Sequence, residues 1–411
     1  MQYLSRAADR QLQDTLGAMG GVLIEGPRAC GKTSTALQLA GSSVRLDQSP
    51  ELITLADLDP SAVFAGDTPR LIDEWQLAPS LWNSIRHEID SRQQVGQFIL
   101  SGSASPHYDV TRHSGAGRIG RLRMHTMSLA ESGASSAEIP LNSINSSTTV
   151  SAHSPLTYRD LAEQAVRGGW PGYLGLTTHQ AMIANRSYLD NLCNIDIPQA
   201  TGIRHTPRQV RRLLTSLARN ISQEVTLKTL AHDTDTDEKT VSTYLDALST
   251  VFAYDPLPAW SVSLRSKSRL RTSPKVHLCD PSIGLAALGI SAERLAAQPD
   301  YFGQVYESMV IRDLRALASA DGGTVYHYRD NTGLEVDAII EYWDGSWAGI
   351  EVKLGSTEIP KGEANLLKLR DERINLDTVG PPRYLAVITG TEYALTLPSG
   401  VHVIPLGTIG I

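Results

Sequence analysis

Short apolar runs alternate with helical patterns over the first 130 residues, and this alternation predicts a parallel α/β sheet. The runs at 22–25, 44–47, 70–73 and 97–100 each end in a polar or glycine-rich turn. The segments between them are patterned to form helices that cross from one strand to the next. Strands that alternate with helices in this way are typical of a parallel sheet covered by helices.

The pattern changes further along the chain, and the changes predict three domains. Residues 1–131 form the first α/β domain. Residues 132–154 are rich in Ser and Thr without a helical or strand period, which predicts a linker. Residues 155–270 are mostly helical. Residues 271–411 return to mixed α/β, with a long helix near 305–319 followed by strands.

A helix-turn-helix pattern lies at residues 226–250, and we interpret it as part of a winged helix. The apolar face of its second helix follows the spacing i, i+3, i+4, i+7 with Val241, Tyr244, Leu245 and Leu248. A helix that reads DNA should present basic and amide groups on its exposed side. This region is instead acidic, which favours a packing or protein-contact role.

Composition limits the functional classes without choosing among them. The chain has 411 residues, 37 basic and 44 acidic side chains and a net charge of −7, and 41% of it is hydrophobic. These values exclude a mainly disordered or collagen-like chain, and they argue against a protein that coats nucleic acid through bulk charge. The three cysteines are far apart, which predicts reduced thiols and no disulfide framework. No signal peptide or membrane-length apolar run is evident, so we expect a soluble, cytoplasmic protein without a membrane anchor.

Residues 26–33 read GPRACGKT and satisfy the spacing G-x-x-x-x-G-K-[ST] between a strand and a helix. Backbone N–H groups of such a loop converge on phosphates at a helix N-terminus. Lys32 would reach the β- and γ-phosphates, and Thr33 would supply a hydroxyl to Mg²⁺. The residues that we expect to bind ATP are Gly26, Pro27, Arg28, Ala29, Cys30, Gly31, Lys32, Thr33 and Ser34.

Polar side chains at the ends of two later strands complete this expected site. Asp73 and Glu74 follow an apolar strand, as in a Walker B site, where Asp73 holds Mg²⁺ and Glu74 polarises the attacking water. Ser101 and Ser103 end the next strand and are candidate sensors of the γ-phosphate, or simple strand terminators. The carboxyl ends of parallel strands face the nucleotide.

Arg118 and Arg121 follow in the segment GAGRIGRLRM and are candidates for an arginine finger. The alternative is that both are solvated surface residues. A finger that acts in trans would imply a homo-oligomer, and the sequence alone leaves the choice between cis and trans open.

The chain resembles the AAA-type bacterial and archaeal ATPases that join an N-terminal P-loop domain to a C-terminal domain of unknown function. The resemblance rests on VLIEGPRACGKT, LIDEWQ, FILSGSAS and GAGRIGRLRMHTMSLAESG, and continues through SPKVHLCDPSIGLAALG, YESMVIRDL and GLEVDAII with GIEVKLG. It implies phosphate binding by the P-loop glycines, Lys32 and Thr33, and roles in Mg²⁺ binding and hydrolysis for Asp73 and Glu74. Ala29 and Cys30 stand where this family would have Gly-Val.

A second constellation lies near the C-terminus. Asp337 and the pair Glu351 and Lys353 fall on two successive predicted strands, in the D…E-x-K arrangement of restriction-endonuclease-like nucleases. Two carboxylates would hold Mg²⁺ against a phosphate, and the lysine would activate water or offset charge. Glu307 on the preceding helix could add a carboxylate. A docking module that keeps only the fold, or a surface ion pair, is the alternative.

Positive charge gathers at residues 204–212 and 265–275. These clusters could bind the phosphates of DNA, or they could be solvated faces or partners of the acidic turn. They comprise Arg204, Arg208, Arg211 and Arg212, and then Arg265, Lys267, Arg269, Arg271 and Lys275.

Three functional hypotheses follow. The favoured one is an ATPase that uses ATP and Mg²⁺ and whose nucleotide state controls the winged-helix and nuclease-like modules. The second is a metal-dependent DNA nuclease in which ATP binding is regulatory. The third is a nucleotide-gated module that binds DNA or a protein partner without cleavage.

Overall fold

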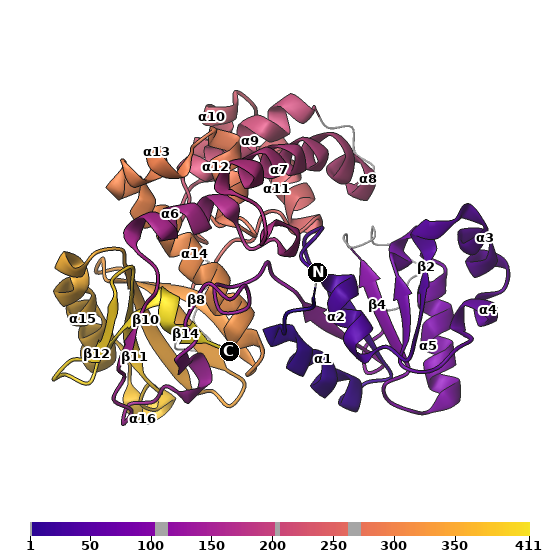
Figure 1. Ribbon diagram of the computed structural model, residues 1–411, viewed down its shortest axis with the longest axis horizontal. Coiled ribbons are helices and arrows are strands. Elements are labelled where there is room, and N and C mark those ends of the chain that lie inside the picture. The colour runs from indigo at the N-terminus through magenta and orange to yellow at the C-terminus, as the bar shows by residue number, and fades with distance from the viewer. Residues whose placement is uncertain (1, 103–113, 202–205, 262–272) are drawn as a thin grey trace.

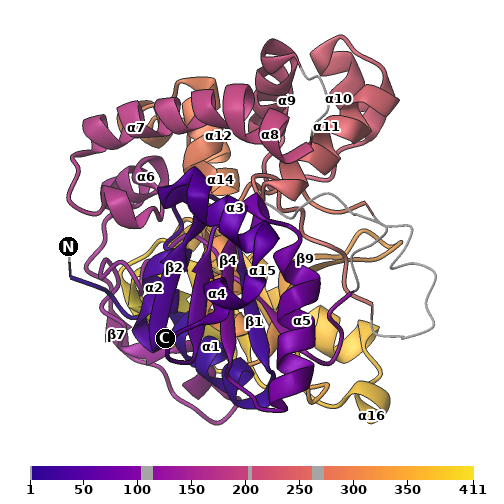
Figure 2. The same ribbon diagram turned by 90° about the vertical axis from the view of Figure 1, so that its right-hand side faces the viewer.

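The computed structural model describes residues 2–102, 114–201, 206–261 and 273–411. These residues form two α/β domains and a helical region (Figure 1). The helical region lies above both α/β domains in two perpendicular views (Figure 2).

The first domain contains a five-stranded parallel sheet in the order β2-β3-β4-β1-β5. Its strands are β1 (Gly21–Glu25), β2 (Ser42–Arg45), β3 (Arg70–Asp73), β4 (Phe98–Gly102) and β5 (Ile119–Arg123). The predicted parallel sheet is therefore confirmed, with strand ends shifted by one or two residues.

Helices cover both faces of this sheet because its strands are apolar on both sides. The helices are α1 (Ala7–Ala18), α2 (Lys32–Leu39), α3 (Pro50–Leu58), α4 (Pro60–Phe64) and α5 (Leu81–Arg92). Val22 and Ile24 of the central strand pack with α1 and α2 on one face. Leu23 packs with α3, α4 and α5 on the other face, as the alternation of strand side chains requires.

The helical region has one apolar cluster to which α7, α9, α10, α11 and α12 contribute, whereas α6 and α13 pack into the core of the third domain. Its helices are α6 (Tyr158–Arg167), α7 (Thr178–Asn191), α8 (Ile197–Thr201), α9 (Pro207–Arg219), α10 (Leu227–Thr234), α11 (Glu238–Thr250), α12 (Pro281–Leu288) and α13 (Ala292–Ala296). The predicted helix-turn-helix pattern corresponds to α10 and α11, and the winged helix stays a prediction. Val276, Leu278 and Ile283 belong to the same cluster, so its packing continues beyond the boundary expected at residue 270.

The third domain is a seven-stranded mixed sheet in the order β7-β12-β13-β11-β10-β9-β8. Its elements are α14 (Pro299–Ser319), β8 (Gly323–Arg329), β9 (Glu335–Tyr342), β10 (Trp347–Lys353), α15 (Ile359–Lys368), α16 (Leu376–Val379), β11 (Leu385–Thr389), β12 (Tyr393–Thr396) and β13 (His402–Pro405). β8, β9 and β10 are antiparallel, whereas β10, β11 and β13 run parallel. α14 packs on one face of the sheet and α15 on the other.

Residues 132–154, which we call the strap, differ from the expected linker because they pack on the third domain. β7 (Ala152–His153) joins the edge of the seven-stranded sheet beside β12. β6 (Ile139–Pro140) pairs with β14 (Ile409–Gly410). Four apolar side chains of the strap are buried in the core of the third domain, namely Ile139, Leu141, Ile144 and Val150. Although these four apolar residues are few among the Ser and Thr residues of the strap, their burial fixes its position.

Candidate functional site

The P-loop connects the end of β1 to the beginning of α2 at the carboxyl edge of the first sheet. Its two glycines adopt backbone conformations that favour glycine, with φ of +153° at Gly26 and +103° at Gly31. A Cβ on Gly26 would come within 2.3 Å of the carbonyl oxygen of Met124, so a larger residue cannot be accommodated without a backbone shift. The loop thereby brings the N-terminus of α2 to the place where phosphates would bind.

Ala29 also lies in the left-handed region, with φ of +63°. It stands where the resembling family would have glycine, and the left-handed conformation costs a non-glycine residue about 1–2 kcal/mol. The next residue, Cys30, is buried in the cluster beneath α1 and α2. The loop therefore keeps the glycine-like backbone in spite of the substitution.

Contacts from outside the loop hold it in this conformation. Arg6 donates from Nη1 to the carbonyl oxygen of Cys30 at 2.8 Å and from Nε to Glu131 at 3.0 Å. The Arg6 and Glu131 side chains are both almost fully buried. Arg28 forms an ion pair with Asp196, which belongs to the helical region. The sequence motif did not identify Arg6, because it lies before the sheet and matches no P-loop signature.

Lys32 is the first residue of α2, and its side chain is turned back into the loop. Its Nζ donates to the carbonyl oxygens of Gly26 and Pro27, each at 2.9 Å. Both partners are neutral, and Lys32 is only 6% exposed. In these contacts the ammonium is bound by carbonyl dipoles and by no carboxylate.

Thr33 and the strand ends of β3 and β4 meet beside this lysine. The Thr33 hydroxyl donates to the Asp73 carboxylate, with both oxygens at 3.0 Å. Asp73 pairs with Ser101 across β3 and β4, and the Ser101 hydroxyl donates to the same carboxylate. Arg45 approaches Asp73 at 3.3 Å. This set of hydroxyl and carboxylate oxygens fits Mg²⁺, which prefers oxygen ligands and retains several waters.

Glu74 is the second carboxylate of the predicted Walker B region and directly follows β3. Its φ is +54°, and its carboxylate accepts a hydrogen bond from Gln76. It is half-buried at the edge of the sheet that carries Thr33 and Asp73. Ser103 lies outside the described residues.

The two arginines proposed as fingers lie on β5 or just before it. Ile119, the neighbour of Arg118, pairs with Gly21 at the beginning of β1, whereas the P-loop follows the end of that strand. Arg118 is therefore at the opposite edge of the sheet, about 13 Å of strand away, and pairs with Asp90 at 2.9 Å. This position contradicts a finger in cis from Arg118. Arg121 lies closer to the loop and binds Glu25 at 3.0 Å.

A cavity of about 290 Å³ lies beside the N-terminal turns of α2. Four parts of the chain line it: the segment before α1, the exposed face of α2 with the P-loop before it, Met127, and the loop that follows α6. Its lining includes Tyr3, Leu4, Ser34, Leu37, Pro171 and Leu174. The cavity is adjacent to the P-loop, since Gly31 also lines it.

Residues 123–131, which we call the connector, join this site to the other parts of the chain. Arg123 forms an ion pair with Asp255 of the helical region at 3.1 Å. The amide of Leu129 donates to Asp313 of α14 at 2.9 Å. Glu131 binds Arg6, as described above. The connector therefore contacts the support of the P-loop, the helical region and the main helix of the third domain.

The second constellation also comes together, at the junction of α14, β9 and β10. Lys353 Nζ lies 2.6 Å from Glu351 and 3.4 Å from Asp337. Lys275, which precedes α12, lies 2.8 Å from Glu307 and 3.4 Å from Asp337. The predicted D…E-x-K residues and Glu307 are thus neighbours, and a second lysine joins them. We refer to these five residues as the carboxylate–lysine cluster.

The three carboxylates of this cluster differ in their pKa values. Burial raises the pKa of Asp337, but Lys275 and Lys353 together bring it down to about 2. Burial and the charge of Asp337 raise the pKa of Glu351 to about 8, although Lys353 opposes this shift. Burial and Asp337 likewise raise the pKa of Glu307 to about 7, against the effect of Lys275.

The carboxylates that the sequence assigns to a divalent metal ion are paired with lysines in this structure, and metal binding there stays a prediction. Among the described residues, no group of three or more His, Cys, Asp or Glu side chains is arranged to hold a metal ion. The carboxylates are instead bound by the two lysine ammonium groups.

The described part of the first basic patch forms one face of α9. Arg208, Arg211, Arg212 and Arg219 line a hollow of about 260 Å³ there. Arg211 is neutralised by Asp190, and Asp233 also lines the hollow. Of the remaining basic residues, Lys275 is buried in the carboxylate–lysine cluster. Arg204, Arg265, Lys267, Arg269 and Arg271 lie outside the described residues.

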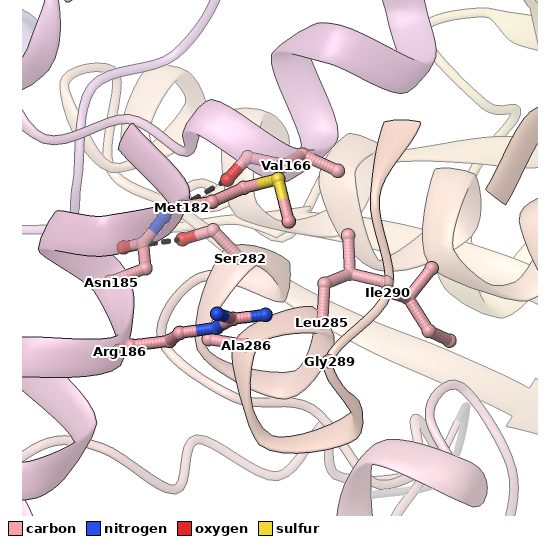
Figure 3. A pocket seen from close by; sticks show the side chains of 9 residues that line it. All are labelled: Val166, Met182, Asn185, Arg186, Ser282, Leu285, Ala286, Gly289 and Ile290. Carbon is pink, nitrogen blue, oxygen red and sulfur yellow. Dashed lines mark hydrogen bonds between the residues drawn. The ribbon is translucent and has the colours of Figure 1, made fainter. Parts of the chain in front are cut away.

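A small pocket between α6, α7 and α12 is structural in character. Its volume is only about 10 Å³, barely enough for one water molecule. The Asn185 side chain crosses it, donating to the carbonyl oxygen of Val166 at 2.9 Å and lying 3.4 Å from the Ser282 hydroxyl (Figure 3). These bonds tie α7 to its neighbours.

Three family models match separate parts of the chain. Residues 20–133 match an AAA domain, residues 158–294 a domain of unknown function (DUF8612), and residues 302–409 another domain of unknown function (DUF4143). The first match, together with the loop geometry, confirms a P-loop domain of the AAA ATPase type. The restriction-endonuclease-like core stays a prediction.

Similar whole proteins include uncharacterized proteins of Mycobacterium tuberculosis (Rv2008c) and Mycobacterium bovis (Mb2031c). Each is 27% identical to this chain over 359 residues, covering 86% of this chain and 74% of the relative. Among solved structures, the Walker-type ATPase PABY2304 of Pyrococcus abyssi aligns with a TM-score of 0.42 and 14% identity, covering 70% of this chain and 99% of that one. None of the described helices has the length and apolar character needed to cross a membrane.

Proposed function

We propose that the first domain binds ATP with Mg²⁺ and hydrolyses it, and that the nucleotide state controls how the other two parts of the chain are arranged. The observation that carries this proposal is the convergence of Lys32, Thr33 and Asp73 at the N-terminus of α2. Lys32, which is held only by carbonyl oxygens, supplies the cation that a nucleoside triphosphate requires. Thr33 and Asp73, whose side-chain oxygens are 3.0 Å apart, supply the oxygen ligands that its metal ion requires.

Each residue has a distinct role in this proposal. Lys32 leaves the carbonyl oxygens of Gly26 and Pro27 and binds the β- and γ-phosphates, while backbone N–H groups of the loop bind the phosphate oxygens. Thr33 and Asp73 would hold the Mg²⁺ ion, which offsets charge on the phosphates. Glu74 polarises the attacking water.

Ser101 is proposed as the sensor of the γ-phosphate because its hydroxyl already touches Asp73. A change at the metal would alter this hydrogen bond and reach β4. Ser103 keeps the same proposed role on sequence grounds alone.

The cavity beside α2 is proposed to take the base and ribose of the nucleotide. It offers the apolar side chains of Leu4, Leu37 and Leu174 next to the P-loop. Leu174 follows the α6 loop of the helical region, so a bound nucleotide would contact two parts of the chain at once.

This shared lining supports the coupling that we propose between hydrolysis and domain arrangement. The Arg28–Asp196 ion pair and the 2.6 Å hydrogen bond from the amide of Met127 to the carbonyl oxygen of Gly169 join the same two parts. Contacts that depend on the γ-phosphate would therefore alter this junction, as in other nucleotide-dependent switches.

We keep Arg118 as a candidate arginine finger only for the case in which the protein forms a homo-oligomer. Its position at the far edge of its own sheet would then let it approach the nucleotide of a second copy. Arg121 is the alternative finger.

Two substitutions test the ATPase proposal. Lys32→Ala should lower phosphate release by more than about hundredfold, since it removes the cation that stabilises the transferred phosphoryl group. Glu74→Gln should bind ATP normally and lose hydrolysis. Binding is measured with a fluorescent ATP analogue, and hydrolysis by phosphate release.

Lys361→Ala is the control, because Lys361 is 72% exposed on α15 and remote from the P-loop. Phosphate release at the normal rate by both Lys32→Ala and Glu74→Gln would refute the assignment.

The second candidate is a nucleotide-gated binding module with nuclease-like architecture. The convergence of Glu307, Asp337, Glu351 and Lys353 favours the architecture, and the arginine face of α9 offers a site for the phosphates of DNA. A metal-dependent nuclease activity requires, in addition, a divalent ion in the carboxylate–lysine cluster. Incubation of the protein with DNA and Mn²⁺, beside an Asp337→Ala control, distinguishes binding from cleavage.

A further inference from the structure

Lys275 reaches the carboxylate–lysine cluster from outside the nuclease-like core. Its backbone exchanges hydrogen bonds with Leu257 at 2.9 and 3.0 Å, and the amide of the next residue, Val276, donates to the carbonyl oxygen of Gln223 at 2.8 Å. Leu257 is buried in the core of the third domain and Val276 in that of the helical region, so this stretch lies at the junction of the two. The Lys275 side chain is only 8% exposed and ends between two carboxylates. The Nζ lies 2.8 Å from Glu307 Oε1 and 3.4 Å from Asp337 Oδ1.

The second oxygen of Asp337 and both oxygens of Glu351 are also bound. Asp337 Oδ2 accepts a hydrogen bond from the amide of Val352 at 2.9 Å and lies 3.4 Å from Lys353 Nζ. Glu351 binds Lys353 through one oxygen and accepts from Asn365 at 3.1 Å through the other. The cluster therefore satisfies its carboxylates with donors of this chain.

An ammonium group between two carboxylates provides the positive charge that a divalent ion would otherwise provide. Glu307 Oε1 and Asp337 Oδ1 cannot bind Lys275 and a divalent ion at the same time, since an ion in contact with these oxygens would lie against the Lys275 ammonium. In a buried setting this repulsion is weakly screened. The ion would also have to replace the charge-assisted hydrogen bonds that the lysine donates.

We propose that Lys275 occupies the cation position of the nuclease-like site, so that Glu307 and Asp337 bind a divalent metal ion only when Lys275 is absent or displaced. Lys353 belongs to the E-x-K strand itself and remains in place. Lys275 is the removable member, because it lies outside the helix α14 and the strands β9 and β10 that carry the other four residues of the cluster. This inference concerns a site separate from the P-loop and stands without the ATPase proposal.

The test is Mn²⁺ binding, measured in nucleotide-free protein by electron paramagnetic resonance of the free ion. In the presence of Lys275, Asp337→Asn should leave the Mn²⁺ binding of the chain unchanged, because Glu307 and Asp337 then bind no Mn²⁺. Lys275→Met should bind Mn²⁺ at least about tenfold more tightly than the wild type at this site, since a like charge next to the ion has been removed. Adding Asp337→Asn to Lys275→Met should abolish the gain.

Lys361→Met serves as the matched control, because it removes an exposed lysine of the same domain. Loss of the Lys275 charge could also unfold the protein. In that case Mn²⁺ must restore folding, followed by circular dichroism, because the ion would replace the missing charge.

Three outcomes would overturn the proposal: wild-type Mn²⁺ binding that depends on Asp337, a folded Lys275→Met variant that binds no more Mn²⁺ than the wild type, or an unfolded variant that Mn²⁺ does not rescue. Because ATP is omitted, none of them bears on the P-loop assignment.

Discussion

The first and third domains each place lysine and carboxylate side chains together at the edge of a sheet, but they arrange the charges in opposite ways. In the first domain, Lys32 is held by neutral carbonyl oxygens, and Asp73 accepts hydrogen bonds from two hydroxyls and has one charged partner, the half-exposed Arg45 at 3.3 Å. In the third domain, Lys275 and Lys353 bind carboxylates directly.

This difference separates a site prepared for ligands from a site that neutralises itself. Neutral dipoles orient a charge without cancelling it, so phosphates and Mg²⁺ can still gain from binding. Oppositely charged side chains in contact have already gained this energy, and a ligand must first separate them. Similar residue types thus give a receptive site in one domain and a closed one in the other.

The largest expected effect is that of Arg6→Ala on the free energy of unfolding. This substitution tests whether contacts from outside the P-loop hold the receptive site rigid. The substitution leaves Glu131 buried without its cationic partner and frees the carbonyl oxygen of Cys30, so the free energy of unfolding should fall by about 3–5 kcal/mol. Urea denaturation followed by circular dichroism measures it. Exposed Arg10, replaced by alanine, is the matched control. An equal, small effect of both substitutions would contradict the role of Arg6.

The pH dependence of stability tests the self-neutralised cluster. The pKa of Glu351 is raised to about 8, above that of the unfolded chain, so the folded state retains a proton that the unfolded state releases. The contribution of Glu351 to stability, measured as the difference between the wild type and Glu351→Gln, should therefore decrease by about 2 kcal/mol as the pH rises from 6 to 8.5.

Glu351→Gln removes this titration and should change the pH dependence of stability by that amount, whereas Glu358→Gln, at an exposed position, should not. Denaturation midpoints at the two pH values provide the measurement. The same pH dependence in the wild type and in Glu351→Gln would show that Glu351 carries no such proton.

The smallest expected effect is on the affinity for ATP, to which we propose that the cavity beside α2 contributes. Leu37→Trp should fill part of the space proposed for the base and weaken ATP binding about tenfold, or about 1.4 kcal/mol. Hydrolysis at saturating ATP should be unchanged. Leu58→Trp places the same side chain at an exposed position on α3 and should leave affinity unaltered. Fluorescence titration with an ATP analogue compares the two, and equal affinities would argue against a base site here.

The sequence predicted those features that local patterns determine. The parallel strands of the first domain have continuous apolar runs, and Asp73 and Ser101 at their carboxyl ends necessarily meet at one edge, where the P-loop also places Thr33 of α2. The same reasoning predicted that Asp337 would lie near Lys353. These contacts follow from strand alternation and from the order of elements in the chain.

Contacts between distant segments had no such signal. Arg6 supports the P-loop from before the first strand, and Lys275 was interpreted only as part of a basic patch. Arg118 was a candidate arginine finger in cis or in trans, and it precedes β5 at the edge of the sheet opposite its own P-loop. Burial and partner choice at these positions depend on tertiary packing, which a single sequence does not reveal.

The strap also has a consequence for how the chain can be divided. It pairs Ile139 with Ile409 and His153 with Tyr393, so the helical region is an insertion between two parts of one folding unit. During synthesis the apolar side chains of the strap emerge long before their partners, and pairing over such a separation is slow. A fragment that begins at residue 271 would leave the apolar surface beneath the strap exposed. Expression of the third domain alone should therefore include residues 132–154, supplied in the same chain or as a separate peptide.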